Sequence, residues 1–234
     1  KNRQSLLMLD TIFTSRNSVS RVLLVSLFLF TSFLNLAQEV EKCGIYDATI
    51  RAFGITPERL QHISTADLQL ERETAQYIVE RNRGGERDEI ITIPVVFHVI
   101  HNNGVENISS AQIHDALEVV NRDFNALNPD LNEIVSAFSD ITGDVQIEFK
   151  LARKDPDGDC HSGINRIVSQ ETYVGEEEVK LLIHWPRNSY LNVWVCASAG
   201  GAAGYSQYPG SVNNSNDAYL DGIVIQDSYT GSIG

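Results

Sequence analysis

The residues best suited to metal or nucleophilic chemistry in this 234-residue chain are its 6 histidines and 3 cysteines. His98 and His101 lie three apart in a run that predicts a strand, which places their side chains on opposite faces. The two imidazoles therefore cannot chelate one metal ion by themselves. The sequence also lacks the H-E-x-x-H zinc motif, the G-x-S-x-G nucleophile motif, the phosphate-binding loop and the dinucleotide fingerprint. It therefore contains no complete active site of these classes.

Three alternating carboxylates, Asp155, Asp157 and Asp159, have the spacing of a calcium-binding loop. The glycine of such a loop follows the third acidic position, whereas Gly158 precedes it, and no glutamate closes the loop. We therefore expect a solvated turn here.

The cysteines leave more than one interpretation open. An odd number in an exported protein means that at least one thiol is free, metal-bound or paired with another chain. Cys43 is followed by Gly44, and a thiolate beside a flexible glycine can occupy the position of the water on a zinc ion. From the residues alone, a disulfide with Cys160 or Cys196, or an inert thiol, is the simpler interpretation.

The N-terminal residues predict a secretory signal peptide. Arg16 and Arg21 precede an apolar run over residues 22–30, which fades into polar residues after Ala37. We expect cleavage near Ala37 and no stable membrane insertion, because the run is shorter than the roughly 20 residues that span a bilayer. The chain opens with Lys1 and its only methionine is Met8, so we expect the first few residues to lie upstream of the true start.

The net charge of −13 argues against a nucleic-acid partner, because carboxylates repel phosphates. Residues 38–89 are polar and contain two helix-like stretches, one beginning at Thr56-Pro57 and one over residues 67–81. Residues 83–87 interrupt this pattern. The stretch is either a removable prosegment or a small N-terminal subdomain, and the pattern alone favours neither.

The region after residue 90 has the pattern of a compact α/β domain. Residues 91–101 are rich in β-branched side chains and predict a strand buried on both faces, with Pro94 at its start. A capping box at residues 109–112 opens an amphipathic helix that ends before Asn128-Pro129. Four further strands are predicted over residues 145–151, 191–196, 204–208 and 221–225.

Taken together, segments within residues 91–228 resemble the pappalysins, a family of metzincin zinc endopeptidases related to pregnancy-associated plasma protein A. Eight motifs occur in the same order over one domain. They are Ile93-Pro94-Val95-Val96-Phe97-His98-Val99, Asn121-Arg122-Asp123-Phe124-Asn125 with Asn128-Pro129-Asp130, Ile147-Glu148-Phe149, Asp155-Pro156-Asp157-Gly158, Gly163-Ile164-Asn165-Arg166, Tyr190-Leu191-Asn192-Val193-Trp194-Val195, Gly204-Tyr205-Ser206-Gln207-Tyr208-Pro209-Gly210 and Asp221-Gly222-Ile223-Val224.

The resemblance implies an α/β (α+β) fold: a twisted, mostly parallel five-stranded sheet with one antiparallel edge strand and a backing helix, preceded by a helical prosegment. It implies that residues 90–234 are the upper part of a catalytic domain whose active-site helix follows Gly234. That helix would carry three zinc-binding histidines and a glutamate as general base. This fragment alone is then expected to be inactive.

The same resemblance assigns roles to particular residues. The edge strand pairs with the substrate backbone by strand addition, a role that falls on Gly204, Tyr205, Ser206 and Gln207. Cys43 becomes the inhibitory zinc ligand of a zymogen, which leaves Cys160 and Cys196 free to pair with each other. The implied cofactor is zinc, with calcium as an additional ion, and the implied partner is a protein or peptide substrate outside a bacterial cell.

Two other functions remain as alternatives. A secreted binding or adhesion protein could retain the upper subdomain without catalysis, and then no zinc motif follows Gly234. Residues 38–234 could instead be a complete disulfide-stabilised binding protein, which predicts cooperative folding of this chain alone. We expect an unstable chain, because one face of the sheet would lack its covering helix.

Overall fold

The computed structural model describes residues 43–54, 56–84, 90–139, 142–213 and 215–233. The predicted signal peptide, residues 1–37, lies outside these ranges. Within them, no helix is long and apolar enough to cross a membrane.

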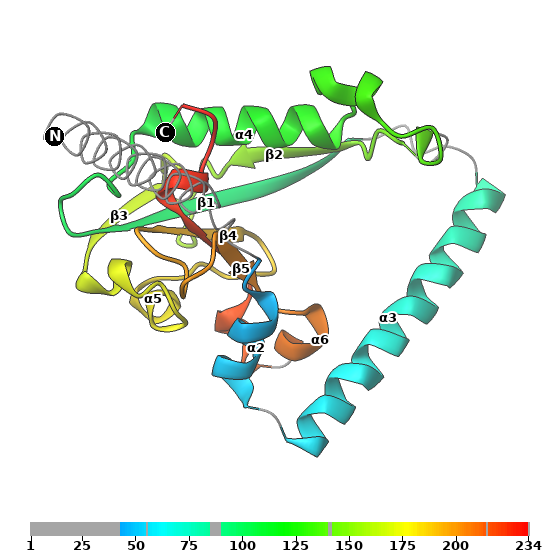
Figure 1. Cartoon of the computed structure of the whole chain (residues 1–234), viewed down its shortest axis with the longest axis horizontal. Helices are drawn as coiled ribbons and strands as arrows, with labels where there is room; N and C mark the ends of the chain where they lie inside the picture. The colour runs from blue at the N-terminus through cyan, green and yellow to red at the C-terminus, as the bar shows by residue number, and fades with distance from the viewer. Residues whose placement is uncertain (1–42, 55, 85–89, 140–141, 214, 234) are drawn as a thin grey trace, which may run out of the picture. The chain divides into compact units, whose positions relative to one another are not determined.

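The structure is an α/β fold built on one mixed sheet, which confirms the predicted fold class (Figure 1). The strands follow the order β2-β1-β4-β6-β5, and β3 pairs with β1 beyond the end of β2. All pairs are parallel except β5 with β6. The strands are β1 (Ile91–His101), β2 (Ile147–Leu151), β3 (Ile164–Val168), β4 (Leu191–Cys196), β5 (Gly204–Ser206) and β6 (Ile223–Gln226).

Helices lie on both faces of the sheet, and the longest helix extends away from it (Figure 1). The longer ones are α2 (Ile45–Phe53), α3 (Pro57–Gly84) and α4 (Ser110–Phe124), and the short ones are α5 (Glu178–Leu182) and α6 (Pro209–Val212). Single turns of 3-10 helix occur at η1 (Pro129–Glu133), η3 (Gln170–Tyr173), η4 (Ala218–Leu220) and η5 (Asp227–Tyr229).

The sheet has a sixth strand because the long central strand β1 pairs with two short strands along one side. The first half of β1 pairs with β2 and its second half with β3, so these two short strands follow one another along the same side of β1. The sequence predicted the other five strands, whereas the segment Ile164–Val168 was noted only as part of the family resemblance. Its short length explains why the pattern alone did not reveal a strand.

Pro94 lies in the fourth position of β1 rather than at its start. The backbone groups of alternate residues in a strand point to opposite sides. The Val95 carbonyl accepts from the Ala152 N–H and the Phe97 N–H donates to the Gly163 carbonyl, so the backbone groups of Val95 and Phe97 point toward β2 and β3. Pro94 therefore faces β4, whose pairing with β1 begins only at Val95 opposite Leu191. No ladder hydrogen bond is lost, which is why the proline is tolerated inside the strand.

The backing helix α4 begins as its capping box predicts, because the Ser109 hydroxyl accepts a hydrogen bond from the Gln112 N–H at 3.1 Å. Farther along, Asn121 bonds both ways with the backbone of Phe149 in β2, at 2.7 and 2.9 Å. Asn125 donates to the carbonyl of Ile147 at 3.1 Å. These side-chain amides satisfy backbone groups on the outer edge of β2.

The two faces of the sheet have separate cores. The face under α4 is aliphatic and includes Val95, Val99 and Ile113. The opposite face includes Ile100, Trp194 and Val224 and also packs against Ala48 of α2. The N-terminal helices therefore contribute to the core of the domain.

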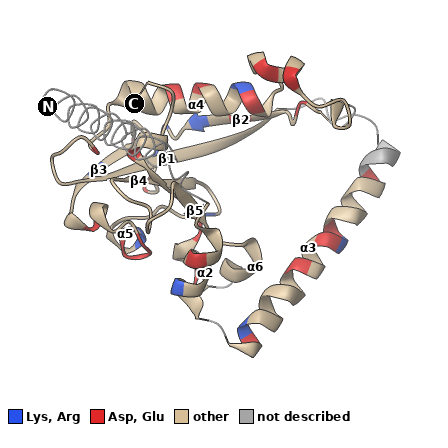
Figure 2. Ribbon diagram, viewed as in Figure 1, with Lys and Arg blue, Asp and Glu red and all other residues tan. Residues whose placement is uncertain are grey.

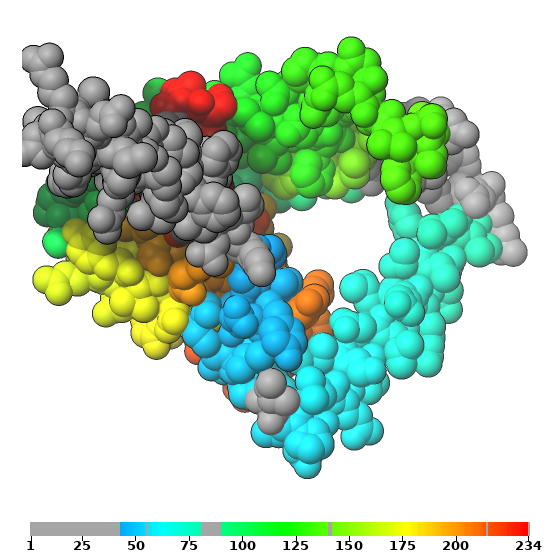
Figure 3. Space-filling model, in the orientation of Figure 1, coloured from blue at the N-terminus to red at the C-terminus, as the bar shows by residue number. Residues whose placement is uncertain are grey.

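Residues 57–84 form one helix, α3, where the sequence predicted two stretches. The Thr56 hydroxyl accepts from the Arg59 N–H at 3.2 Å, as expected for the predicted helix start. The beginning of α3 packs against α6 (Figure 3). The Cα of Gly210 approaches Ala66 so closely that an added Cβ would lie 2.5 Å from the Ala66 methyl carbon. Farther along, Tyr77 and Ile78 are more than half exposed.

Candidate functional site

The clearest candidate site is the outer edge of β5, where a segment from the start of the described chain pairs with the strand. Cys43 forms a parallel bridge with Gly204, and the Gly44 N–H donates to the Gly204 carbonyl at 3.0 Å. On its other side β5 pairs antiparallel with β6, with Tyr205 opposite Val224. Cys43 and Gly44 thus add to the edge strand that the resemblance assigns to substrate.

Glycine is required at position 44 by the closeness of this pairing. Gly44 is buried, and a Cβ added there would lie 2.7 Å from the Cβ of Ala202. Cys43 is exposed and has a free thiol. The order cysteine then glycine therefore places a free thiol beside the strand while the next residue fits against it.

The four residues predicted to bind substrate have different surroundings. Gly204 contributes its carbonyl to the pairing, and Ser206 lies opposite Ile223 of β6. Tyr205 is 2% exposed and its ring belongs to the core. Gln207 is also buried, accepts from the Thr49 hydroxyl at 3.1 Å and donates to Glu177 at 3.1 Å. The edge strand thus contacts the N-terminal residues 43–49 through its backbone and through Gln207.

A second contact between the N-terminal helices and the domain lies at the start of α3. The Arg59 guanidinium stacks 3.9 Å from the centre of the Phe53 ring and forms an ion pair of 3.0 Å with Asp217. It also donates to the carbonyl of Ser211 at 3.4 Å. This contact fixes the junction between α2 and α3 against α6 and η4.

A third contact is made by Arg51, in the last turn of α2. Its Nε atom lies 3.3 Å from Glu176 and 3.8 Å from Glu177, just before α5. Figure 2 shows acidic positions around α5 and a basic position on α2. Opposite charges therefore meet where α2 lies against the domain.

Close to this contact, Lys180 is fully buried. Its ammonium donates to the Leu220 carbonyl at 2.6 Å and lies 5.5 Å and 5.1 Å from the ring centres of Trp194 and Tyr205. Burial lowers the pKa of Lys180 to about 8 and raises the pKa of Glu177. The two groups oppose each other's shift, because each charge stabilises the other.

His98 has a structural role in the interior of the sheet. Its Nε2 lies 2.9 Å from Asn192 Oδ1 and its Nδ1 lies 3.2 Å from the Asn165 amide nitrogen, so both ring nitrogens have partners. Asn192 also exchanges hydrogen bonds with the backbone of Trp185, at 2.7 and 2.9 Å. Burial lowers the pKa of His98 to about 4, so the ring stays neutral near pH 7.

His101 is 5% exposed, and its Nδ1 accepts from the Asn103 N–H at 3.2 Å. Across the described ranges, no group of three or more histidine, cysteine, aspartate or glutamate side chains is placed to hold a metal ion. Cys43 offers a single thiol, and one ligand does not make a zinc site. The described residues therefore do not fit zinc by themselves.

Cys160 and Cys196, whose pairing followed from the resemblance, are both free. Cys160 is exposed in the turn after β2, where its backbone forms an isolated antiparallel β-bridge with Lys154. Cys196 ends β4 in the core beside Trp194, and burial raises the pKa of its thiol to about 12. The structure thus does not form the predicted disulfide, because one thiol lies on the surface and the other in the interior.

The aspartate-rich turn agrees with the interpretation made from its spacing. The Asp155 carboxylate accepts from the N–H groups of Asp157 and Asp159, at 3.1 and 2.9 Å. Its oxygens thus close the turn on itself.

Sequence reasoning missed α2 and the acidic residues that it meets. The stretch Glu176-Glu177-Glu178 before Val179 has the pattern of a solvated surface, and nothing in it predicts that Lys180 is buried. One signal was present: residues 45–53 are amphipathic and Gly54 follows, as at many helix ends.

Comparison with solved structures shows similarity to mirolysin of Tannerella forsythia, among others. Mature mirolysin of Tannerella forsythia in complex with a cleaved peptide is 37% identical with a TM-score of 0.56, covering 63% of this chain and 57% of that chain. A Tannerella forsythia promirolysin mutant is 31% identical with a TM-score of 0.65, covering 82% and 61%. Mirolysin in complex with compound 9 is 37% identical with a TM-score of 0.57, covering 63% and 56%.

No family model and no curated protein sequence matches the chain. The chain spans about three fifths of the length of the mirolysin chains. The α/β fold with its mostly parallel sheet matches the fold of mirolysin, which agrees with the resemblance seen in the sequence. The chain is thus similar in sequence and structure to mirolysin, a metzincin metallopeptidase of the pappalysin family.

Proposed function

We propose that this chain is the N-terminal portion of a secreted, bacterial zinc metalloendopeptidase in its latent form. Residues 1–37 are the signal peptide, residues 38–89 the inhibitory prosegment, and residues 90–234 the upper part of the catalytic domain. The metal-binding helix follows Gly234. The substrate is a protein or peptide whose backbone pairs with the outer edge of β5.

The observation that carries this proposal is the pairing of Cys43 and Gly44 with β5. A peptide bound by strand addition uses the backbone hydrogen bonds of an edge strand. The bond from Gly44 to Gly204 occupies such a position. A segment that occupies the substrate edge prevents substrate from binding there, which is the property required of an inhibitory prosegment.

The comparisons give independent support for the prosegment. The promirolysin structure matches 82% of this chain, whereas the mature mirolysin structure matches 63%. The additional match is the size expected if the N-terminal helices correspond to the part that maturation removes. Mature mirolysin is in complex with a cleaved peptide, which supports a peptide as the substrate class here.

An apolar groove between α4 and the sheet supports a further helix after β6. The groove has a volume of about 400 Å³ and is walled by side chains of both layers. Its walls include Leu117, Val120 and Phe124 from α4 and Val193, Ile223 and Ile225 from the sheet. The residues after β6 reach its rim, since the Gln112 amide donates to the Thr230 carbonyl at 2.9 Å and Asp115 accepts from Ser232. An amphipathic helix that continues from there would cover the groove.

The similarity implies zinc, but the described residues do not complete a zinc site, so we derive no step through the metal. The contribution of these residues is to present a strand edge and to cover it in the latent form. Cys43 is the thiol nearest that edge in the described chain, and we propose that it faces the metal site in the zymogen.

The test uses the full-length gene product, purified with its prosegment. We expect about one zinc ion per chain, latency in the wild type and peptide cleavage without proteolytic activation in Cys43→Ser. Gly44→Val should also activate the enzyme, because the added side chain collides with Ala202. Ser206→Ala, on the same strand, is the matched control and should leave latency intact.

Absence of zinc together with absence of cleavage in every variant would replace this proposal with the binding or adhesion function. A zinc-containing but permanently inactive protein would lead to the same conclusion. Latency that persists in both variants would show that the pairing with β5 does not inhibit.

A further inference from the structure

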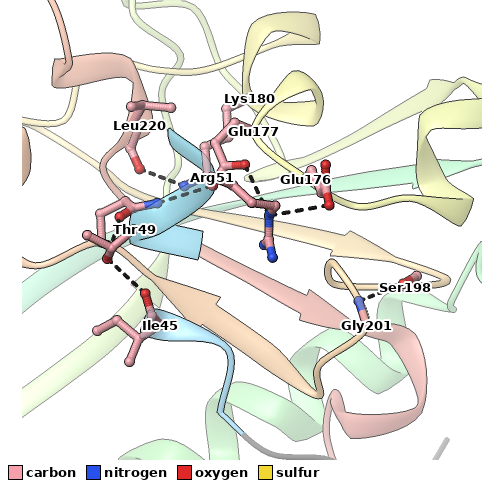
Figure 4. Close-up of polar contacts among 10 residues, drawn as sticks. Ile45, Thr49, Arg51, Glu176, Glu177, Lys180, Ser198, Gly201 and Leu220 are labelled. Atoms are coloured by element: carbon pink, nitrogen blue, oxygen red, sulfur yellow. Dashed lines mark hydrogen bonds and ion pairs between the residues drawn. The ribbon is translucent and has the colours of Figure 1, made fainter. Parts of the chain in front are cut away.

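The Arg51 side chain lies beside the carboxylates of Glu176 and Glu177 (Figure 4), in a pocket that it fills. The pocket consists of Glu176, Glu177, the Tyr205 ring and the backbone at Gly200. The Nε atom lies 3.3 Å from Glu176 and 3.8 Å from Glu177, and the guanidinium carbon lies 5.4 Å from the centre of the Tyr205 ring. A Cβ on Gly200 would lie 2.4 Å from Nη2, so the glycine leaves the space that the guanidinium fills.

The pocket is held in shape by contacts that do not involve Arg51. The Gln207 amide donates to Glu177 at 3.1 Å, and Gln207 is itself buried. Lys180 lies 5.1 Å from the centre of the Tyr205 ring and is fixed by its bond to the Leu220 carbonyl. The ring and one carboxylate are therefore positioned before a cation arrives.

One polar group of the pocket has no partner. Tyr205 is 2% exposed, and its hydroxyl makes no hydrogen bond within the part of the chain that the structure describes. A buried hydroxyl without a partner costs free energy unless a ligand or water satisfies it. Arg51 Nη2 is likewise buried and unbonded there, so its present position does not use all the polar groups available.

The charges favour a cation at this position. Among the described residues, the ion pairs of Glu176 and Glu177 are both with Arg51. Glu177 is half-buried, and desolvation raises its pKa. Removing Arg51 would take away the ion-pair partner of both carboxylates, and the nearby Lys180 ammonium, which interacts with Glu177, already bonds to a carbonyl. A guanidinium suits the pocket better than an ammonium, because it is planar, stacks on aromatic rings and donates in several directions.

We propose that Glu176, Glu177 and Tyr205 form a guanidinium-binding pocket, filled in this structure by Arg51, that binds an arginine side chain of a peptide when Arg51 withdraws. While Arg51 occupies it, the pocket holds α2 and therefore helps to keep Gly44 on β5. After α2 leaves, the same groups bind arginine on the surface of the domain. Neither step involves a metal ion or the cleavage of a bond.

The test is chemical rescue of Arg51→Ala in the complete chain. Amide hydrogen exchange in α2 reports how firmly the helix is held. We expect exchange to rise about fivefold, since a partly buried cation contact of this kind is worth on the order of 1 kcal/mol. Low-millimolar ethylguanidinium should reverse the change, whereas ethylammonium at the same concentration should not.

The carboxylates provide the matched control. Rescue should disappear in Arg51→Ala combined with Glu176→Gln and Glu177→Gln, and wild-type exchange should not respond to either cation. A second arm measures anisotropy of a labelled blocked Gly-Arg-Gly peptide, which should bind Arg51→Ala more tightly than wild type and more tightly than Gly-Lys-Gly binds. The exchange measurement reports on the site that the Arg51 side chain fills, and the anisotropy measurement reports on binding of an arginine from another peptide.

Equal rescue by both cations, or rescue that survives loss of both carboxylates, would overturn the proposal. If Arg51→Ala does not fold, the double carboxylate variant with Arg51 retained is measured instead. It should show the same rise in α2 exchange, and unchanged exchange would count against the pocket. None of these measurements reads metal content or peptide cleavage, so failure of the proposed peptidase function leaves their outcome unaffected.

Discussion

The two faces of the sheet differ in the kind of side chain that they bury and in how completely they bury it. The face toward α2 and α5 contains His98, Lys180 and Asn192, each almost fully buried and each hydrogen-bonded within the chain. The face under α4 is apolar but partly open, with Val120 and Phe124 about two fifths exposed at the groove. His98, Lys180 and Asn192 are thus buried with hydrogen-bond partners from the chain, whereas apolar side chains at the groove remain partly exposed.

This contrast explains why the N-terminal helices matter to the fold. Ala48 of α2 is fully buried with Trp194 and Val224, so the face toward α2 and α5 includes residues of the proposed prosegment. Removing that segment would expose apolar surface on this face as well. The chain with α2 in place therefore has a more complete core than residues 90–234 would have without it.

The largest expected effect is the loss of stability when the Asn192 side chain is removed from the face toward α2 and α5. Asn192→Ala removes the partner of His98 and both bonds to the Trp185 backbone, and unsatisfied buried groups cost about 1–3 kcal/mol each. We expect the free energy of unfolding to fall by about 3 kcal/mol or more, measured by urea denaturation with tryptophan fluorescence. Asn188→Ala, at an exposed site, should change it by less than about 0.5 kcal/mol. Equal losses in the two variants would contradict the contrast between the faces.

The next effect is a loss of stability in acid caused by His98. Its pKa is lowered from 6.5 to about 4 in the folded protein, so below pH 6.5 the unfolded state binds a proton that the folded state does not. Stability should therefore fall as the pH decreases from 6.5 to 4, by up to about 3 kcal/mol, and should not change from this group above pH 6.5.

Urea denaturation at several pH values measures this slope. In His98→Gln, which keeps a polar side chain without a titrating ring, the slope between pH 4 and 6.5 should be shallower. Proton NMR of the His98 ring offers a direct check, because its chemical shift should stay constant down to about pH 5. A midpoint near 6.5 would show that the ring reaches solvent.

The smallest effect is expected in the open groove. Val120→Ser in this chain should change the free energy of unfolding by no more than about 0.5 kcal/mol, because the side chain is already 38% exposed. In the full-length product, a helix that covers the groove should raise the cost of the same substitution to about 1–2 kcal/mol. The same small cost in both proteins would indicate that nothing packs against Val120.

Local sequence pattern predicted those elements whose stability comes from their own residues. The β-branched run marked β1, and Ser109 marked the start of α4 through a cap that the structure confirms. Helix α2 has nine residues, and its position depends on β5 and on Arg51, which contacts residues more than 120 positions away. Such a helix is marginal alone and is stabilised by packing, so a local pattern does not reveal it.

The candidate site was predictable in its residue types but not in its geometry. Cys43-Gly44 stood out because of the glycine, yet its partner Gly204 lies in another part of the sequence. The side chain of Tyr205 points into the core, which the strand pattern allowed but did not require. Burial of Lys180 could not be predicted, because charged residues surround it in the sequence and only the tertiary fold brings Trp194 and Tyr205 over it.

The side-chain amides of Asn121 and Asn125 have a consequence for solubility at high concentration. An exposed sheet edge is a template on which identical molecules can stack into fibrils. At β2 these amides occupy backbone groups that a neighbouring copy would need, and at β5 Gly44 does the same. The edges of β2 and β5 are thereby covered against pairing with a neighbouring copy, and loss of the segment that carries Gly44 would expose the edge of β5.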